Sequence, residues 1–362
     1  MQIDISTASI LFILCFLGIL VTAFWAIEAI KAVSDKFKLS ETFIGAVFLS
    51  VGTSFPEFVN SLSAGWLDRS YLGGNASTIP INSAESFYNI TGANIWQVVF
   101  LAVVMIGLAI YYKIRKNDHD IQQMVDIFWK DSILSWKLLM LETTILIFIF
   151  SWPLIFQYLT VGGFSMLNLI FLGIWLFYIR YTYTSTTTIS EKEEPKYFTK
   201  CGKPALVIIT LSLWSLFGAF SCINFQLASK FPMDPSTSFG VLLSFVTSSP
   251  EFSVLYFLLK QKRYQMAVSG FFGSSLFNLT LPFYSNLISL NTIFGKQNFH
   301  HTGTHEITSQ KITIWLLLNL ILIFLFIFTF WNRKKWRTSI IATNGTIILT
   351  IYVVANTLLG YT

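Results

Sequence analysis

A succession of apolar runs, each long enough to cross a lipid bilayer, is the feature that most constrains this chain. A helix needs about 20 mostly apolar residues to span a hydrocarbon core of about 30 Å. Only 12% of the 362 residues are charged, whereas soluble domains usually carry about 25%. The sequence therefore predicts an all-α integral membrane protein of about ten transmembrane helices, near residues 7–30, 40–65, 86–112, 132–157, 163–183, 204–225, 237–259, 264–290, 312–331 and 338–360.

The distribution of basic residues supports this count. With the N-terminus outside, 19 of the 24 Lys and Arg residues fall in inner loops and four fall outside, while Lys137 lies near an inner helix end. This is the bias of the positive-inside rule. We therefore expect a multi-pass protein of the cell's inner membrane with both termini outside. Because the basic residues lie in short loops and not in one patch, a nucleic-acid partner is excluded, and the expected surroundings are lipid.

A polar cytoplasmic loop at 181–203 divides the chain into two five-helix halves, 1–180 and 204–362. No stretch is long and polar enough for a further soluble domain, and no phosphate-binding GxxxxGK[ST] sequence occurs, which argues against a nucleotide-driven pump. The three cysteines are scattered and form no metal-binding pair. The sequence indicates no cofactor, and it leaves the oligomeric state open.

A short motif occurs once in each half. Residues 52–58 read G-T-S-F-P-E-F, and residues 246–252 read V-T-S-S-P-E-F. The copies lie in the second helix of each half, within repeat 1 (about 40–112) and repeat 2 (about 237–290). Those two helices cross the membrane in opposite directions. The sequence therefore predicts two inverted-topology repeats, an arrangement common in secondary transporters.

The residue types of this motif indicate cation chemistry. A carboxylate near the membrane centre costs about 2.5–3.5 kcal/mol and persists where it faces a cavity or an ion. Proline removes an N–H group and frees carbonyl oxygens in the preceding turn. Side chains three and four positions apart share a helix face. Each copy thus offers one carboxylate and two hydroxyls together, and such an all-oxygen site with two carboxylates suits Ca²⁺ or Na⁺. The six residues are Thr53, Ser54, Glu57, Thr247, Ser248 and Glu251.

A second element follows each copy. Residues 92–97 read G-A-N-I-W-Q, and residues 273–278 read G-S-S-L-F-N. Ala93 and Gln97 are four apart, as are Ser274 and Asn278, so each pair places a small residue and an amide on one face. Small residues let helices approach closely, and amide oxygens can complete a coordination shell.

These regions resemble the alpha-repeats of the calcium/cation antiporter superfamily, and of sodium/calcium exchangers in particular, whose pattern is roughly G-T-S-x-P-E followed by G-S-N-x-F-N/D. The resemblance implies a secondary active antiporter that exchanges Ca²⁺ against Na⁺ by alternating access at a midplane site built on Glu57 and Glu251. It places ion-binding positions at Thr53, Ser54, Glu57, Gln97, Thr247, Ser248, Glu251, Ser274 and Asn278.

The chain departs from the family pattern at four places. Asn278 replaces a common acid, Ala93 replaces a serine, and Gln97 is one methylene longer than the usual asparagine. The first repeat also contains extra residues around Tyr71–Ser83, in an outer loop at 66–84 to which we assign no role from sequence. These changes leave the transported ion and its stoichiometry open.

Rival functions remain on the same scaffold. A cation/proton antiporter would use the same carboxylates without sodium, and a channel would line a continuous pore with the same oxygens. An enzyme is not expected, because no HExxH sequence and no histidine within an inner span occurs. Glu142, near the middle of the fourth span, is more simply a partner of a neighbouring helix than a proton site. The outer-loop histidines His300, His301 and His305 are not expected to bind a metal, because flexible loops rarely preorganise ligands.

Overall fold

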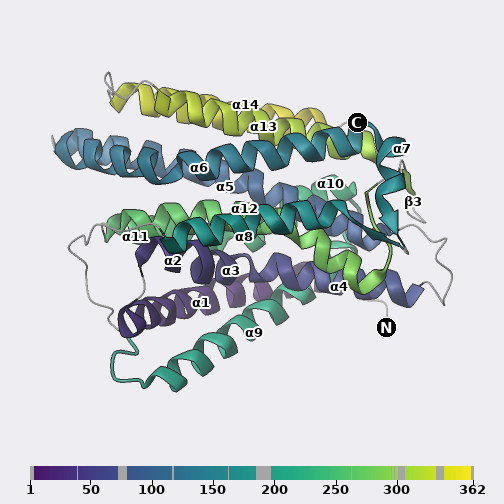
Figure 1. Cartoon of the computed structure of the whole chain (residues 1–362), viewed down its shortest axis with the longest axis horizontal. Coiled ribbons are helices and arrows are strands. Elements are labelled where there is room, and N and C mark those ends of the chain that lie inside the picture. Colours follow the sequence, from purple (N-terminus) through teal and green to yellow (C-terminus); the bar gives the residue numbers. More distant parts are fainter. Residues whose placement is uncertain are drawn as a thin grey trace.

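The structure is a computed structural model that is almost entirely helical (Figure 1). It describes residues 4–38, 40–71, 80–115, 118–161, 163–184, 197–261, 263–294, 296, 298–300, 306–331 and 338–359. The helices are α1 (Ile5–Phe37), α2 (Glu41–Ile44), η1 (Gly45–Leu49), α3 (Ser50–Thr53), α4 (Phe55–Tyr71), α5 (Ile81–Arg115), α6 (Asp118–Ser151), α7 (Pro153–Phe156), η2 (Gln157–Leu159), α8 (Leu167–Thr184), α9 (Lys203–Ala228), α10 (Pro235–Thr237), η3 (Ser238–Leu243), α11 (Ser244–Lys260), α12 (Tyr264–Ser289), α13 (Ser309–Trp331) and α14 (Thr338–Leu359).

Each of the ten predicted spans falls largely on helix, but fewer of these helices qualify as membrane spans by length and apolar composition. Among the described residues five do so, namely Ile5–Phe37, Ile81–Val104, Ile133–Ser151, Lys203–Ala228 and Pro235–Lys260. A sixth is formed if the pair Thr42–Thr53 and Phe55–Arg69, bent by 49°, counts as one broken span. Ser309–Leu325 and Gly345–Val354 are apolar but shorter. In Figure 1, α1 begins and α14 ends at the same end of the bundle.

Helix α12 explains part of this difference. It is long enough to span a bilayer, yet it is rich in Ser, Asn and Thr. Most of its side chains are buried, because α4, η1, α5, α6 and α8 all pack around it (Figure 1). A helix shielded from lipid by protein has no need of an apolar surface. The polar residues within the predicted span 264–290 therefore mark the centre of the bundle.

The periphery has the opposite character. Helices α1 and α9 pack along each other and expose large apolar side chains, among them Ile10, Leu14, Val21, Ile208 and Leu211. A continuous apolar surface of this kind fits contact with lipid chains and not with water.

Two π-helical turns occupy equivalent positions in the two repeats. One is η1, directly before Ser50, and the other is η3, directly before Ser244. In both, the serine hydroxyl donates to a carbonyl four residues earlier, that of Ala46 or of Gly240. The sequence motif did not predict these turns. They are frequent at functional sites, because they displace the side chains that follow.

Glycines set the packing of each π-helical turn against the other repeat. A Cβ atom at Gly92 would overlap the carbonyl oxygen of Gly240 and lie 2.6 Å from Ser244 Oγ. A Cβ atom at Gly273 would lie 2.8 Å from the Ala46 oxygen. Helix α5 therefore seats against η3 as α12 seats against η1, with equivalent partners in each contact.

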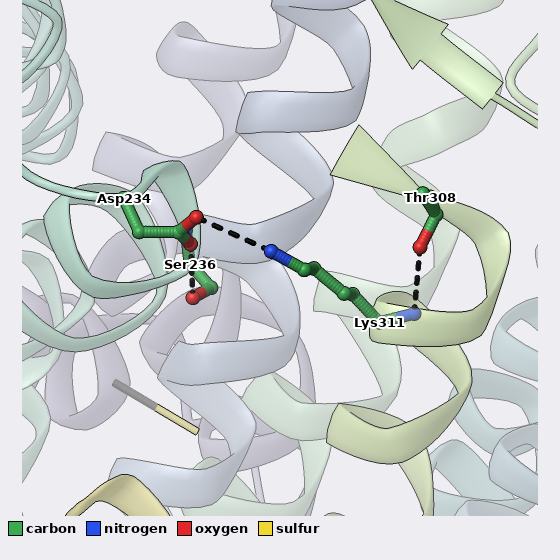
Figure 2. A network of polar contacts seen from close by, with 4 residues as sticks. All are labelled: Asp234, Ser236, Thr308 and Lys311. Atoms are coloured by element: carbon green, nitrogen blue, oxygen red, sulfur yellow. Dashed lines mark hydrogen bonds and ion pairs between the residues drawn. The ribbon is translucent and has the colours of Figure 1, made fainter. Parts of the chain in front are cut away.

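Polar contacts tie the helix ends. Figure 2 shows Asp234, the N-cap of α10, accepting from the Ser236 hydroxyl at 2.5 Å while its other oxygen lies 3.4 Å from Lys311 Nζ. The Lys311 amide in turn donates to the Thr308 hydroxyl at 3.2 Å. These contacts fix the start of α13 beside α10 and η3.

Two short hairpins, which the sequence did not predict, join helices. Strand β1 (Thr160–Val161) pairs with β2 (Phe164–Ser165), and β3 (Asn298–His300) pairs with β4 (Glu306–Thr308). His300 lies in β3 opposite Glu306, whereas His301 and His305 lie outside the described residues. Within the part of the chain that the structure describes, no group of three His, Cys, Asp or Glu residues is placed to hold a metal ion.

The glycine contacts predict a position-dependent response to alanine. Gly92→Ala is expected to lower the free energy of unfolding by about 1–3 kcal/mol, since the methyl group has a carbonyl in its way. Gly107→Ala in the same helix is the matched control, because a Cβ there meets nothing within 4 Å. Thermal unfolding of both purified variants measures the difference, and equal midpoints would contradict the packing described.

Candidate cation site

The two motif copies differ in backbone. In the first, α3 ends at Thr53, Ser54 leaves the helical region with φ −89° and ψ 10°, and α4 begins at Phe55. In the second, α11 continues through Pro250. The expectation that proline loosens each copy is therefore confirmed as a helix break only in the first. Proline still removes one backbone hydrogen bond from α11.

Glu251 is the centre of a hydrogen-bond network to which helices α5, α11 and α12 and the turn at Ser54 contribute. Its Oε1 accepts from Ser54 Oγ at 3.1 Å and also from the hydroxyl of Ser274. Its Oε2 accepts from Gln97 Nε2 at 2.5 Å. The hydroxyl oxygens of Ser54 and Ser274 are 2.5 Å apart, and Gln97 Nε2 is 2.8 Å from Ser274 Oγ. The structure thus brings one predicted residue from each of the four sequence elements onto a single carboxyl group.

Glu57 has a different environment. It is fully buried, and neither carboxyl oxygen has a hydrogen-bond partner among the described residues. Thr247 and Glu251, both from the second repeat, lie close enough to act electrostatically on Glu57. The hydroxyl of Ser248, the equivalent of Ser54, is buried and likewise without a partner in the described chain. Glu57 and Ser248 therefore present oxygen atoms that nothing in the described protein satisfies.

The remaining predicted residues lie beside these two groups. Asn278 does not reach Glu251 by hydrogen bond; its Nδ2 donates to Asn94 Oδ1 at 3.0 Å, and its Oδ1 has no partner in the described residues. Thr53 donates to the Leu49 carbonyl of its own helix at 2.9 Å. Thr247 contacts Asn89 Oδ1 at 3.3 Å. Ala93 is buried and contributes no polar side-chain atom.

Sequence reasoning missed three polar residues, Asn94, Ser275 and Asn89. Asn94 donates to the Ser275 carbonyl at 3.2 Å, and the Ser275 hydroxyl donates to Gln97 Oε1, so these two orient Gln97 and Asn278. Asn89 accepts from the Thr247 hydroxyl. Asn94 and Ser275 directly follow the predicted small residues of the second elements. A search for polar residues at equivalent positions of both repeats would have found them.

A small cavity lies on each side of the Glu57–Glu251 centre along α12. The first, which we call the apolar cavity, touches Glu251 and Thr53 and is lined by Leu49, Val254, Leu255, Ala267, Gly270 and Phe271. The second, the serine-lined cavity, is bordered by Ser61, Ser83, Ser86, Ser285 and Asn286 among others. Ser274 and Asn278 lie between the two sets of α12 residues, so the cavities approach the centre from opposite directions.

The loop at 66–84 borders the serine-lined cavity. Asp68, near the end of α4, accepts from the backbone and side chain of Asn82 at 3.0 and 2.9 Å. Its other oxygen accepts from the backbone and hydroxyl of Ser83 at 2.9 and 2.5 Å. The Ser83 hydroxyl also contacts Ser285 at 2.6 Å. Asp68 thus joins α4 to the start of α5, whereas residues 72–79 of the loop lie outside the described chain.

One comparison with known proteins identifies a family. The profile described as "Sodium/calcium exchanger protein" matches residues 7–184 and 203–360. No curated protein sequence is a significant match.

Several solved structures share the fold. A structure of the sodium-calcium exchanger NCX_Mj soaked with 2.5 mM Na⁺ and 0.1 mM Sr²⁺ has a TM-score of 0.57 and 16% sequence identity, covering 98% of this chain and 99% of that one. One soaked with 100 mM Na⁺ and 10 mM Sr²⁺ has a TM-score of 0.56 and 17% identity over the same shares. One with zero Na⁺ and Ca²⁺ has a TM-score of 0.52 and 16% identity, covering 96% and 99%.

The unequal partners of the two motif serines predict unequal effects on stability. Ser54→Ala removes a donor to the buried Glu251, so we expect the free energy of unfolding without added cation to fall by about 1–3 kcal/mol. Ser248→Ala is the matched control and removes a buried hydroxyl that lacks a partner, so we expect little change or a small gain. Thermal unfolding measures both, and similar losses would contradict the asymmetry described here.

Proposed function

Because the chain belongs to the sodium/calcium exchanger protein family, we propose that it is a secondary active antiporter that exchanges Ca²⁺ for Na⁺ at Glu57 and Glu251. Inorganic cations are the transported substrates of this family, which is one of exchangers and not of enzymes. The observation that carries the proposal is that the two buried carboxyl groups lie close enough to interact, among side chains that carry oxygen atoms.

The oxygen atoms without partners supply the ligands for the cation. Glu57 offers two, Ser248 one and Asn278 one among the described residues, and all three side chains are fully buried. Hard cations such as Ca²⁺ and Na⁺ prefer carboxylate, amide and hydroxyl oxygens. Two carboxylates neutralise one Ca²⁺ or two Na⁺, so competition for the same pair couples the two fluxes.

Gln97 sets a condition on binding at Glu251. Its amide N–H group carries partial positive charge and contacts Glu251 Oε2 at 2.5 Å, where a cation would also contact that carboxylate. A cation on Oε2 therefore requires the amide to withdraw or to turn its oxygen inward. Gln97, Ser54 and Ser274 hold Glu251 in place without a cation, and they exchange hydrogen bonds for metal contacts when one arrives.

In the proposed alternating-access mechanism, the two cavities are the routes by which ions reach the Glu57–Glu251 centre from each side of the membrane. The apolar cavity lies along α12 from Ala267 to Phe271, and the serine-lined cavity lies along it from Pro282 to Asn286. Widening one while closing the other would expose the centre to one side at a time, as rocking of one repeat against the other does in transporters of this plan.

The proposed topology has ten transmembrane helices in two inverted five-helix halves, 1–180 and 204–362, with 181–203 as the cytoplasmic linker. Equivalent π-helical turns and equivalent glycine contacts in both repeats support it. Both termini then lie outside the cell's inner membrane, which places the serine-lined cavity toward the outside and the apolar cavity toward the cytoplasm.

Ion flux tests the exchanger proposal. Proteoliposomes loaded with Na⁺ should take up radiolabelled Ca²⁺, and Glu57→Gln and Glu251→Gln should each abolish the uptake. Loss of one carboxylate from a buried charge pair costs about 2–5 kcal/mol, which corresponds to a 30-fold or greater loss of affinity. A parallel set of vesicles carries only a pH gradient.

Each result has a separate meaning. Uptake that requires internal Na⁺ and disappears in both variants supports Ca²⁺/Na⁺ exchange. Uptake driven by the pH gradient alone would show that the protein exchanges cations for protons. Flux that neither saturates nor requires a counter-ion would indicate a channel. Normal exchange in both variants would refute the carboxylate site.

The two cavities predict opposite sidedness of chemical labelling. In a background without the three native cysteines, Ser285→Cys should react with a membrane-impermeant thiol reagent from outside, and Ala267→Cys from the cytoplasmic side. Saturation with Na⁺ or Ca²⁺ should change the two rates in opposite directions, because opening of one route closes the other. Labelling of both cysteines from the same side would contradict the proposed routes.

A further inference from the structure

Glu142 is a buried carboxyl group that the exchange site does not use. It lies in α6 within the apolar span Ile133–Ser151, and its side chain is fully buried. Neither of its oxygens has a hydrogen-bond partner among the described residues. The expectation that Glu142 pairs with a neighbouring helix is therefore wrong for the part of the chain that the structure describes.

Ring contacts place Glu142 at the level of the exchange site. Trp136 of α6 contacts Phe272 of α12, with ring centroids 4.4 Å apart, and Phe150 contacts Phe294 beyond the end of α12 at 5.8 Å. Helices α6 and α12 therefore run in the same direction. Glu142 is six residues, or about 9 Å, beyond Trp136, and the same rise along α12 leads from Phe272 to Asn278.

Helix α5 gives the same level independently. Phe150 contacts Phe87 of α5 with ring centroids 5.2 Å apart, and α5 runs in the opposite direction to α6 (Figure 1). Because the helices are antiparallel, a step of eight residues back along α6, from Phe150 to Glu142, matches a step of eight residues forward along α5, from Phe87 to Ile95. Glu142 thus lies level with the hydrogen bond between Asn94 and Asn278.

Unpartnered polar atoms gather on the helices around Glu142. Both α12 and α13 pack against α6. Asn278 of α12 has a free Oδ1, and Asn319 of α13 is fully buried with neither amide atom bonded within the described chain. An ionised carboxylate without donors costs several kcal/mol in an apolar interior, whereas a protonated carboxyl group carries no charge and avoids most of that cost.

Among the side chains that the structure describes, no charged group of the surrounding elements compensates a charge on Glu142. Lys137 of α6 is exposed and lies five residues away, on another face of the helix. Helices α7 and α12 contain no acidic or basic residue, and Lys311 of α13 pairs with Asp234. The other ionisable side chains that the structure describes on the elements packed against α6 lie toward helix ends or at other levels: Glu85, Tyr88 and Tyr111 of α5, Tyr178, Arg180, Tyr181 and Tyr183 of α8, and Tyr264 and Tyr284 of α12.

We propose that Glu142 is a proton-binding site whose occupancy is linked to cation binding at Glu57 and Glu251; this inference rests on the function proposed above. Glu142 holds a proton while the centre lacks a cation. A cation at the centre makes the local potential more positive, so the proton leaves Glu142 for the water on the side to which the centre is open. Linkage is reciprocal, so a lower pH weakens cation binding.

Proton release on cation binding tests this linkage. Ca²⁺ is added to purified protein in weakly buffered detergent solution containing a pH-sensitive dye. Wild type should release more protons per bound Ca²⁺ than Glu142→Gln, by up to about one. Glu85→Gln is the matched control, because Glu85 is a buried carboxyl on α5 that has an interaction partner, and its release should equal that of wild type.

The outcomes separate this inference from the exchanger proposal. Unchanged release in Glu142→Gln, with Ca²⁺ binding intact by calorimetry, overturns the proton site alone. Wild type that binds neither Ca²⁺ nor Na⁺ overturns both proposals. A second measurement needs no variant: a hydrophobic carbodiimide, which modifies protonated carboxyl groups, should label Glu142 in wild type several-fold less when Ca²⁺ is saturating. Labelling that does not respond to Ca²⁺ also overturns the inference.

Discussion

Two carboxyl groups buried in the middle of a membrane bundle constrain everything packed around them. Glu251 is stabilised by donors from α5, α12 and the broken turn at Ser54, and these reach one carboxyl group only if the helices approach closely. Close approach in turn requires Gly92 and Gly273, where a Cβ atom would press on the π-helical turn of the other repeat. The glycines, the π-helical turns and the hydroxyl donors thus all help to offset the free-energy cost of removing the Glu251 carboxyl group from water.

The two repeats share backbone features around the site, but their side-chain contacts differ. The hydroxyls of Ser50 and Ser244 make equivalent hydrogen bonds to backbone carbonyls in the two repeats. Ser54, however, donates to Glu251, whereas the Ser248 hydroxyl has no hydrogen-bond partner among the described residues. In the same way α4 is separated from α3 at its motif, while α11 is continuous. If the two halves have the proposed inverted topology, an exchange of these local arrangements between them would convert an opening toward one side into an opening toward the other. The asymmetry is therefore consistent with the proposed alternating-access mechanism.

Much of this arrangement was predictable because it follows from local residue chemistry. Apolar runs gave the helices, and the repeated motif with its small-residue elements gave the residues that meet at Glu251. The contact of Gln97 with Glu251 and the failure of Asn278 to reach it were not predictable, because they depend on side-chain length and on the relative level of helices far apart in sequence. The π-helical turns also escaped prediction, since no local residue pattern distinguishes them from the α-helix that they interrupt. The central position of α12 explains why this helix fails a test based on apolar composition: a helix surrounded by protein has no need of an apolar surface.

The charge of the site follows from where the acids lie. The exchanger pattern that this chain resembles often has a third acid in its second repeat, and Asn278 stands there instead. A third buried acid does occur at the same level of the bundle, but on α6, as Glu142. It forms no bond to Glu57, Glu251 or the residues between them, so it adds no ligand to a cation held there. A charge at this position acts on the cation only through the electric field, and a single buried carboxyl group without described hydrogen-bond partners is suited to bind a proton. Moving the acid from α12 to α6 would thus turn a residue that helps to hold the cation into one that reports whether the cation is present.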